Sequence, residues 1–238
     1  MRAGLSRLKE TSMLLHIPQV LNAAQLQDIR KALNQGDWVD GKQSSGAQAA
    51  QAKQNRQLST ACTQFDALSG LVANALNKHP LFIAGVLPLH TLPPMFNRYE
   101  NGGCYGNHTD NSLQANQQTG QKVRTDVSVT VFLNPPEEYE GGELVIEDHF
   151  GAQEIKLDAG DAIAYPSTSL HRVEPVTKGC RFASFLWIQS LIRHHGQRAM
   201  LFDLDMTIVK LRHQLGDTPE VLALTNHYHK LIQQWAET

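Results

Sequence analysis

Apolar residues recur with helical spacing in two segments of the first eighty positions. Residues 23–35 follow Asn22, a residue suited to capping a helix, and they stop before Gly36. Residues 64–77 carry large apolar side chains three or four positions apart, namely Phe65, Leu68, Leu71, Val72 and Leu76. The pattern predicts one helix over each segment. Between them, residues 41–57 are rich in Gln, Ala, Ser and Gly, which predicts a mobile loop or weak helix without core contacts.

From residue 82 to residue 189 the pattern changes to short runs of β-branched and aromatic residues between turn-forming clusters. In residues 126–134, DVSVTVFLN, three valines alternate with Ser128, Thr130 and Phe132, so the two sets should face opposite sides of a sheet. About eight strands in such a stretch favour a double-sheet jelly roll, although a simpler sandwich gives the same pattern. Strands are predicted near 82–89, 95–100, 126–133, 143–148, 153–157, 161–165, 171–176 and 180–189.

The pattern returns to helical after Ser190. Residues 197–237 predict two amphipathic helices divided near 216–219, where Thr218 or Asp217 can cap the second helix and Pro219 suits its first turn. We expect this helical annex to pack on the β core or to form a homo-oligomer contact. The fold class expected is mainly β with flanking helices. The regions expected are an extension (1–12), an N-terminal helical and strand region (13–80), the jelly-roll core (81–190) and the annex (191–238).

Composition and charge exclude several classes of partner. The chain has 238 residues and a formal net charge of −2, without a long run of Lys or Arg, so neither nucleic acid nor an anionic membrane is implied. No signal peptide and no stretch of about 18 apolar residues is present, which predicts a cytoplasmic protein. Three cysteines without CxxC spacing suit a reducing compartment and argue against a structural zinc site. Residues 1–12 precede Met13, and we expect them to be a dispensable extension with translation starting at Met13.

Candidate chemistry begins in residues 97–112, NRYENGGCYGNHTDNS. His108 and Asp110 are two positions apart, so on a strand their side chains point to the same face and can hold one ion. Taken alone, these residues are explained better by a polar turn after the glycines at 102 and 103. His171 makes the metal site the better explanation, because it supplies a third ligand. Two histidines and one carboxylate on one side of a metal leave its other coordination positions open for substrates, as in non-haem Fe(II) oxygenases.

Arg181 is the second distant residue that bears on this site. It stands in the predicted strand 180–189 and shares a face with apolar residues, namely Ala183, Phe185 and Trp187. A buried guanidinium needs an anion, and the distal carboxylate of a metal-chelating co-substrate would provide one. The alternative is a surface strand arginine paired with a neighbouring acid.

These residues resemble a known family. Residues 99–110 are similar to the Tyr-x-x-Gly-x-x-Tyr-x-x-His-x-Asp motif of the prolyl-hydroxylase-like branch of the Fe(II)/2-oxoglutarate dioxygenases, with His171 and Arg181 completing the pattern. Two longer stretches look like those of the bacterial PKHD-type (PiuC-like) hydroxylases, namely RTDVSVTVFLNPPEEYEGGELVI and LDAGDAIAYPSTSLHRVEPVTKGCRFASFLWIQSLIR. The resemblance runs from Met13 to the C-terminus.

The resemblance implies a fold, a reaction and roles for five residues. His108, Asp110 and His171 would bind Fe(II), Arg181 would bind the carboxylate of 2-oxoglutarate, and Tyr99 would hydrogen-bond the same co-substrate. It implies a double-stranded β-helix core and hydroxylation of a substrate by O₂ with release of succinate and CO₂. It also implies ascorbate as a reductant and a link with iron uptake. The substrate itself, peptidyl or small molecule, is not implied.

Other interpretations remain open at this point. The same fold could serve as a non-catalytic sensor of iron or 2-oxoglutarate, or as a cupin-type enzyme, although cupins require HxH and a following Glu. Tyr99 and Tyr105 could be core aromatics. Residues 111–124 follow the ligands and lack core side chains, which predicts a lid over the substrate. The remaining histidines are expected to be solvated or in turns, namely His149, His194, His195, His227 and His229.

Overall fold

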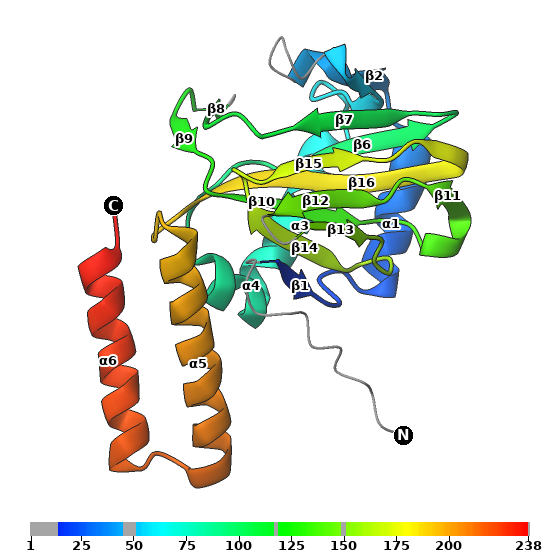
Figure 1. Ribbon diagram of the computed structural model, residues 1–238. Helices are drawn as coiled ribbons and strands as arrows, with labels where there is room; N and C mark the ends of the chain where they lie inside the picture. Colours follow the sequence, from blue (N-terminus) through cyan, green and yellow to red (C-terminus); the bar gives the residue numbers. More distant parts are fainter. Residues whose placement is uncertain (1–13, 45–50, 117–118, 149–150, 238) are drawn as a thin grey trace.

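The computed structural model describes residues 14–44, 51–116, 119–148 and 151–237 (Figure 1). The predicted extension 1–12 and the predicted turn residue His149 lie outside these ranges. Two antiparallel sheets stand face to face and form the jelly roll that the strand pattern predicts. The division into four regions stays a prediction.

The larger sheet has nine strands, seven of them in the order β1-β14-β10-β16-β6-β4-β2, with β11 and β5 also paired to β16. Its strands are β1 (Leu15–Ile17), β2 (Trp38–Asp40), β4 (Arg56–Leu58), β5 (Pro88–Thr91), β6 (Met95–Glu100), β10 (Val127–Phe132), β11 (Tyr139–Gly141), β14 (Ala162–Pro166) and β16 (Val176–Ser190). The smaller sheet has the order β13-β12-β15-β7-β3. Its strands are β3 (Lys53–Gln54), β7 (Cys104–His108), β12 (Leu144–Asp148), β13 (Gly151–Ile155) and β15 (Leu170–Val173). A separate hairpin joins β8 (Leu113–Ala115) to β9 (Lys122–Arg124).

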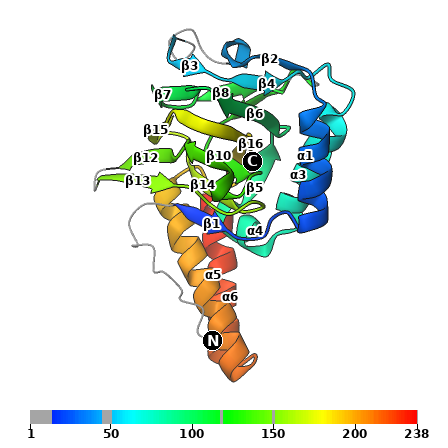
Figure 2. The same ribbon diagram turned by 90° about the vertical axis from the view of Figure 1, so that its right-hand side faces the viewer.

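Helices α1 (Ala23–Asn34) and α3 (Phe65–Lys78) cover the outer face of the larger sheet (Figure 2). Asn22 caps α1 as predicted, because its side chain accepts from the Gln25 backbone while the Gln25 side chain accepts from the Asn22 backbone. The apolar faces of both helices share one buried core with the valines of β10. This packing places the other face of β10 against the smaller sheet.

The space between the two sheets holds a second core and the polar site. Phe132 of β10 belongs to this inner core, whereas Val127, Val129 and Val131 belong to the outer one, so the predicted alternation is confirmed. Ser128 and Thr130 share the inner face with Phe132, and both are buried. A polar pair on the inside of a jelly roll requires partners there.

The turn after β6 carries the chain from one sheet to the other. β6 pairs with β16 in the larger sheet, and β7 pairs with β15 in the smaller one. Asn101 and Gly102 adopt positive φ angles of 53° and 78°, a conformation that glycine takes without a steric penalty. The glycines of the motif therefore redirect β7 so that His108 faces β15.

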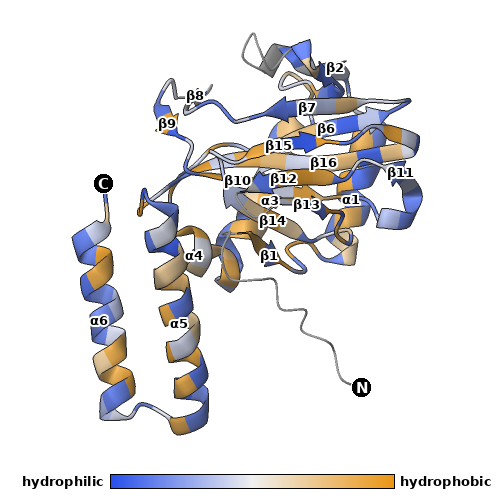
Figure 3. Ribbon diagram, viewed as in Figure 1, coloured by the Kyte–Doolittle hydropathy of each residue, from blue (hydrophilic) through white to orange (hydrophobic). Residues whose placement is uncertain are grey.

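Helices α5 (His195–Leu215) and α6 (Pro219–Trp235) form the predicted hairpin, with Thr218 capping α6. The hairpin extends away from the sheets, and Figure 3 shows polar and apolar residues interleaved along both helices. Leu201 packs with Leu87 and Ile192 at the base, so the annex does contact the core. Its role as a subunit contact stays a prediction. Within the described residues, no helix combines the length and the apolarity that a membrane span requires.

Three predictions about local structure are wrong. Residues 82–89 are mostly helix α4 (Pro80–Val86), which starts with Pro80 and ends where Leu87 adopts a φ of 48°. A continuous apolar run lacks the period that separates strand from helix. In the polar tract 41–57, residues 53–54 and 56–58 form β3 and β4, because strand pairing uses backbone groups and needs no apolar side chain. The loop 111–124 contains the β8–β9 hairpin, and its Val123 is buried.

Candidate metal centre and co-substrate pocket

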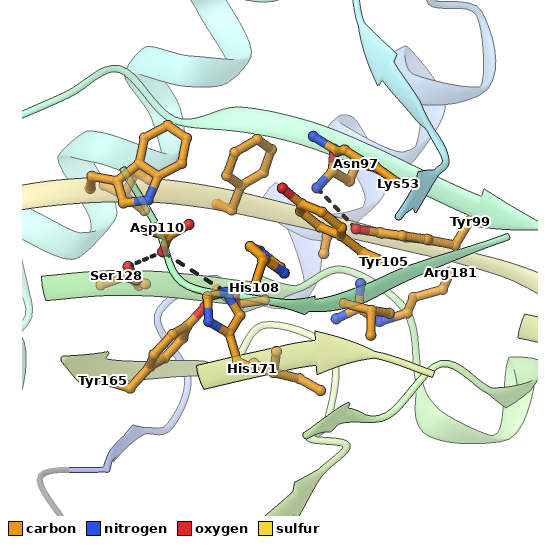
Figure 4. Close-up of a pocket in the computed structure, with 18 residues that line it drawn as sticks. Lys53, Asn97, Tyr99, Tyr105, His108, Asp110, Ser128, Tyr165, His171 and Arg181 are labelled. Atoms are coloured by element: carbon orange, nitrogen blue, oxygen red, sulfur yellow. Dashed lines mark hydrogen bonds and ion pairs between the residues drawn. The ribbon is translucent and has the colours of Figure 1, made fainter. Parts of the chain in front are cut away.

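Three of the predicted site residues meet between the sheets. His108 ends β7, Asp110 follows it, and His171 lies on β15 (Figure 4). One ligand atom from each residue lies within 4.8 Å of the others. In the described residues this is the one such group of His, Cys, Asp or Glu side chains. Two imidazoles and one carboxylate on the same side form the donor set that suits non-haem Fe(II).

Backbone carbonyls orient both histidines. The Nδ1 atom of His108 lies 2.8 Å from the Gly106 oxygen, and that of His171 lies 3.0 Å from the Ser169 oxygen. A carbonyl oxygen can only accept, so each Nδ1 must carry the proton. Each Nε2 is then left with a lone pair for an ion, which is the arrangement that supports metal-bound histidines elsewhere.

Asp110 is held by two serines that the sequence analysis did not single out. Ser128 Oγ donates to Asp110 Oδ2 and lies 2.7 Å from Ser167 Oγ, while the Asp110 backbone N–H donates to the Ser167 oxygen at 3.3 Å. Ser128 stands on the polar inner face of β10, and its alternation with valine was the signal that could have identified it. Thr109, between the ligands, does not line the cavity of His108 and His171; it lines a second cavity, which Asp110 also lines.

Burial and charge keep His108 neutral. Burial, the neighbouring His171 and, more weakly, Lys53 lower the pKa of His108 to about 4, while the Gly106 carbonyl and Asp110 oppose the shift. The Tyr105 ring stacks on the His108 ring with centroids 3.5 Å apart. At neutral pH the imidazole therefore needs to lose no proton before it binds a metal ion.

Arg181 lies deep in the same cavity. It faces Tyr99 across the β16–β6 pairing, and its guanidinium lies 5.3 Å from the centroids of the Tyr99 and Phe132 rings. The side chain is 2% exposed, yet Nε and Nη2 have no hydrogen-bond partner among the described residues. The alternative of a surface arginine paired with an acid is wrong. A buried cation with two free donors fits the distal carboxylate of 2-oxoglutarate.

Tyr99 lies in the same cavity as Arg181, but two roles fit its position. Its side chain is 1% exposed and lines the cavity, and burial raises its pKa to about 12. The hydroxyl accepts a long hydrogen bond of 3.4 Å from Asn97. Tyr99 can therefore donate to a bound carboxylate, but it also serves as a core aromatic of the inner cluster.

The cavity has two chemically different ends. It contains about 600 Å³ of empty space including the solvent at its mouth, and Figure 4 shows Asp110 and Ser128 on one side of the two histidines with Arg181 and Tyr99 on the other. Lys53, which is 3% exposed and lies over the Tyr105 ring at 4.9 Å, and Tyr165, which packs edge-on against His171, complete the polar lining. Lys53 comes from the tract predicted to be a loop, and no pattern in that tract could have identified it.

Comparison with known proteins agrees with this geometry. Residues 94–189 match the family described as the 2OG-Fe(II) oxygenase superfamily, and residues 195–237 match the PKHD-type hydroxylase C-terminal domain. A PKHD-type hydroxylase from Hyphomonas neptunium is 56% identical over 225 residues, which are 94% of this chain and 100% of the relative. One from Aliarcobacter butzleri is 54% identical over the same shares.

Solved structures show the same fold at low sequence identity. A prolyl hydroxylase from Trichoplax adhaerens, solved with a peptide of a hypoxia-inducible factor, has a TM-score of 0.53 at 17% identity over 80% of this chain and 87% of its own. A prolyl-4-hydroxylase from Pseudomonas putida has a TM-score of 0.50 at 18% identity over 76% and 94%. The fold and the site define a 2-oxoglutarate-dependent dioxygenase. Within that class, the chain belongs to the family of PKHD-type hydroxylases.

Proposed function

We propose that this enzyme hydroxylates its substrate with O₂ while 2-oxoglutarate is converted to succinate and CO₂. One oxygen atom enters the substrate and the other enters succinate, so the atoms of the reaction balance. The observation that carries the proposal is the cavity itself, with the donor group of His108, Asp110 and His171 between its ends and the unpaired Arg181 at one end.

The three ligands and two supporting serines would hold Fe(II). A bound iron would supply the one-electron and O₂ chemistry that amino-acid side chains lack. His108 and His171 offer Nε2, because their Nδ1 atoms face carbonyl groups. Asp110 offers a carboxylate whose orientation Ser128 fixes. The protein's contribution is to arrange three ligands on one side and to leave the other side open.

Arg181 would bind and orient 2-oxoglutarate. Its planar guanidinium can donate two parallel hydrogen bonds to the distal carboxylate, and Tyr99 can donate a further one. The neighbouring walls are apolar, with Leu144, Val173 and Leu186 lining the cavity. These side chains exclude water and thereby strengthen the ion pair.

The test measures turnover of the co-substrate and modification of a product. Purified protein with Fe(II), 2-oxoglutarate and O₂ should release succinate, and the omission of either Fe(II) or 2-oxoglutarate should abolish release. Mass spectrometry of a treated cell extract should show a product heavier by one oxygen atom. His108→Ala and Asp110→Ala should abolish both signals. Unchanged turnover in either variant would contradict the proposal, and binding without turnover would support a sensor instead.

Further details of the function extend the proposal. The substrate is peptidyl or a small molecule, ascorbate acts as the reductant, and the enzyme works in the cytoplasm in connection with iron uptake. Family resemblance supports the roles of ascorbate and iron uptake, and three cysteines without CxxC spacing support the cytoplasmic location. The extract experiment with and without ascorbate addresses the substrate and the reductant. The lid formed by residues 111–124 is supported by its attachment next to Asp110. Limited proteolysis should cut it more slowly when metal and 2-oxoglutarate are bound.

A further inference from the structure

A second cavity lies beside the metal centre. It is formed where the chain leaves β16 and enters α5, and it contains about 1060 Å³ of empty space including the solvent at its mouth. Asp110 lines both cavities, so the two cavities adjoin at this residue. The second cavity is lined mostly by polar residues of four segments, namely 109–110 with 112, 124–126, 166–168, and 193–195 with 198. Apart from Asp110 and the predicted lid residues Ser112 and Arg124, none of its lining residues was given a role by the sequence.

The lining carries more positive than negative charge. Arg124, Arg193 and Arg198 face two aspartates, and two exposed histidines lie between the last two arginines. Arg124 is neutralised, because its Nε lies 2.7 Å from one Asp126 oxygen and its Nη1 lies 3.0 Å from Glu237. The other aspartate, Asp110, would have its charge taken up by the metal. The arginines at 193 and 198 are left as the excess cations.

Arg198 is buried and forms no ion pair within hydrogen-bond distance among the described residues, although Asp126 lies near it. It is 1% exposed, and its Nη1 donates to the backbone oxygens of Ile192 at 2.7 Å and Arg193 at 2.8 Å. Its Nε has no partner in the part of the chain that the structure describes. Burial and, more weakly, Arg124 lower the pKa of Arg198 to about 10 while Asp126 opposes the shift, so Arg198 stays charged at neutral pH. A buried guanidinium with an unused donor is costly unless an anion completes it.

Arg193 is exposed and unpaired beside it. None of the ion pairs formed among the described residues involves Arg193. It immediately precedes His194, the N-cap of α5. The side chain is therefore available to a ligand at the start of the helix.

The start of α5 adds a third source of positive potential. His194 makes no capping hydrogen bond with its side chain, so the first backbone N–H groups of this 21-residue helix lack that partner. A side chain added at Gly196 would meet no atom within 4 Å, so the space beside these groups is open. An uncapped helix N-terminus favours an anion by its dipole and by its free donors.

The position of this cavity relates it to the reaction. Figure 4 shows Asp110 and Arg181 on opposite sides of the two histidines, so the proposed 2-oxoglutarate carboxylate lies on the side of the metal centre away from Asp110. The second cavity begins at Asp110. A molecule seated in it would approach the metal centre from the side of Asp110, away from the proposed co-substrate carboxylate.

We propose that this second cavity binds an acidic group of the substrate, a carboxylate or a phosphate, between Arg193, Arg198 and the N-terminus of α5. The binding places a neighbouring carbon of the substrate at the metal centre. That the bound acid belongs to the substrate rests on the proposed function, whereas the anion site is inferred from the cavity alone. The inference narrows the substrate to an acidic molecule or an acidic segment of a protein.

The test uses inorganic phosphate and acetate as probes of the full chain. Each is titrated into ¹⁵N-labelled protein loaded with stoichiometric Zn(II) and excess 2-oxoglutarate, so that Arg181 is already occupied. We expect saturable shifts of the His195 and Gly196 amide signals, with a dissociation constant on the order of 1 mM. Tighter binding of phosphate would assign a phosphate-bearing substrate, and tighter binding of acetate a carboxylate-bearing one. Both results support the site, and unmoved amides with both probes overturn it.

A matched pair of variants identifies the residues responsible. Arg193→Ala removes an exposed cation at the cavity, and Lys210→Ala removes an exposed cation from the same helix farther along. Arg193→Ala should weaken probe binding by about fivefold or more, and Lys210→Ala by less than about twofold. Equal effects would show a general charge effect and would overturn the assignment. Arg198 is not used, because its replacement can disturb folding.

Failure of this inference is distinguishable from failure of the proposed function. Succinate release reports the metal centre and Arg181, and the amide shifts report the second cavity. Turnover with unmoved amides would reject the acidic-substrate inference and leave the hydroxylase proposal in place. Amide shifts without turnover would reject the hydroxylase proposal and leave the anion site in place.

Discussion

His108 and His171 are cross-strand partners in the pairing of β7 with β15, and their ring centroids lie 4.2 Å apart. Their Nδ1 atoms both face backbone carbonyls two residues earlier in the chain, which leaves both Nε2 atoms for an ion. The register of one strand pair thus brings together two ligands that are distant in sequence. A change that shifts this register by one residue would turn one imidazole away.

Removal of His171 should abolish metal binding. We expect His171→Ala to weaken Fe(II) binding by more than about 100-fold. The variant removes one of the three protein ligands, so the metal loses one bond and the three-ligand geometry that suits iron. Anaerobic calorimetry with Fe(II) measures the affinity. His229→Ala, which removes an exposed histidine of α6, is the matched control and should leave the affinity unchanged.

The hydrogen bond from Ser128 should matter for metal affinity although Ser128 is not a ligand. Ser128→Ala leaves Asp110 free to rotate, so we expect affinity for Fe(II) to fall by roughly tenfold while the fold is retained. The same calorimetry measures the change, and circular dichroism checks the fold. An affinity equal to that of the parent protein would show that Ser167 and the backbone suffice to orient Asp110.

Arg181 should contribute to co-substrate binding at the expense of stability. Its buried guanidinium has two donors without partners among the described residues. Arg181→Met removes this uncompensated charge and replaces it with an uncharged side chain of similar length. We expect 2-oxoglutarate binding to weaken by more than about 100-fold, whereas the free energy of unfolding of the ligand-free protein should stay equal or rise. Calorimetry and urea unfolding measure the two quantities. A large loss of stability would mean that the guanidinium has a partner in the folded protein.

The metal-free protein should lose stability in mild acid because of His108. Its pKa is about 4 when folded and close to 6.5 when unfolded, so the unfolded chain binds the proton more readily between these values. The stabilisation is complete above pH 6.5 and declines by roughly 1–3 kcal/mol as the pH falls toward 4. Urea unfolding in the presence of a chelator measures it. His108→Gln should show a weaker decline over the same range, and an equal decline would assign it to other groups.

Two glycines with similar backbone angles should differ in their tolerance of a side chain. Gly142 has a φ of 71°, and an added Cβ would lie 2.8 Å from Val176 and 3.0 Å from Cδ of Arg181. Gly102 has a φ of 78° with open space around it. We expect Gly102→Ala to cost about 1 kcal/mol of unfolding free energy and Gly142→Ala more than about 2 kcal/mol. Gly142→Ala should also weaken 2-oxoglutarate binding, because Arg181 must move.

Local sequence patterns determined those elements whose own residues carry the information. The cap and apolar spacing of α1, the alternation along β10 and the cap of α6 all depend on neighbours within a few positions, and the structure agrees with each prediction. The metal-ligand hypothesis also came from residue types, since a strand period of two places His108 and Asp110 on one face. The assignment of each ligand stays a prediction until binding is measured.

Tertiary structure decided the features that depend on distant partners. β3 and β4 form in a polar tract because β7 and β6 offer them backbone groups, and this pairing places Lys53 in the cavity. The unpaired donors of Arg181 and Arg198 are likewise visible only once burial and neighbours are known. The second cavity requires the end of the jelly roll and the start of α5 to meet. No local period encodes such contacts, because their energy comes from hydrogen bonds and charges supplied by segments far along the chain.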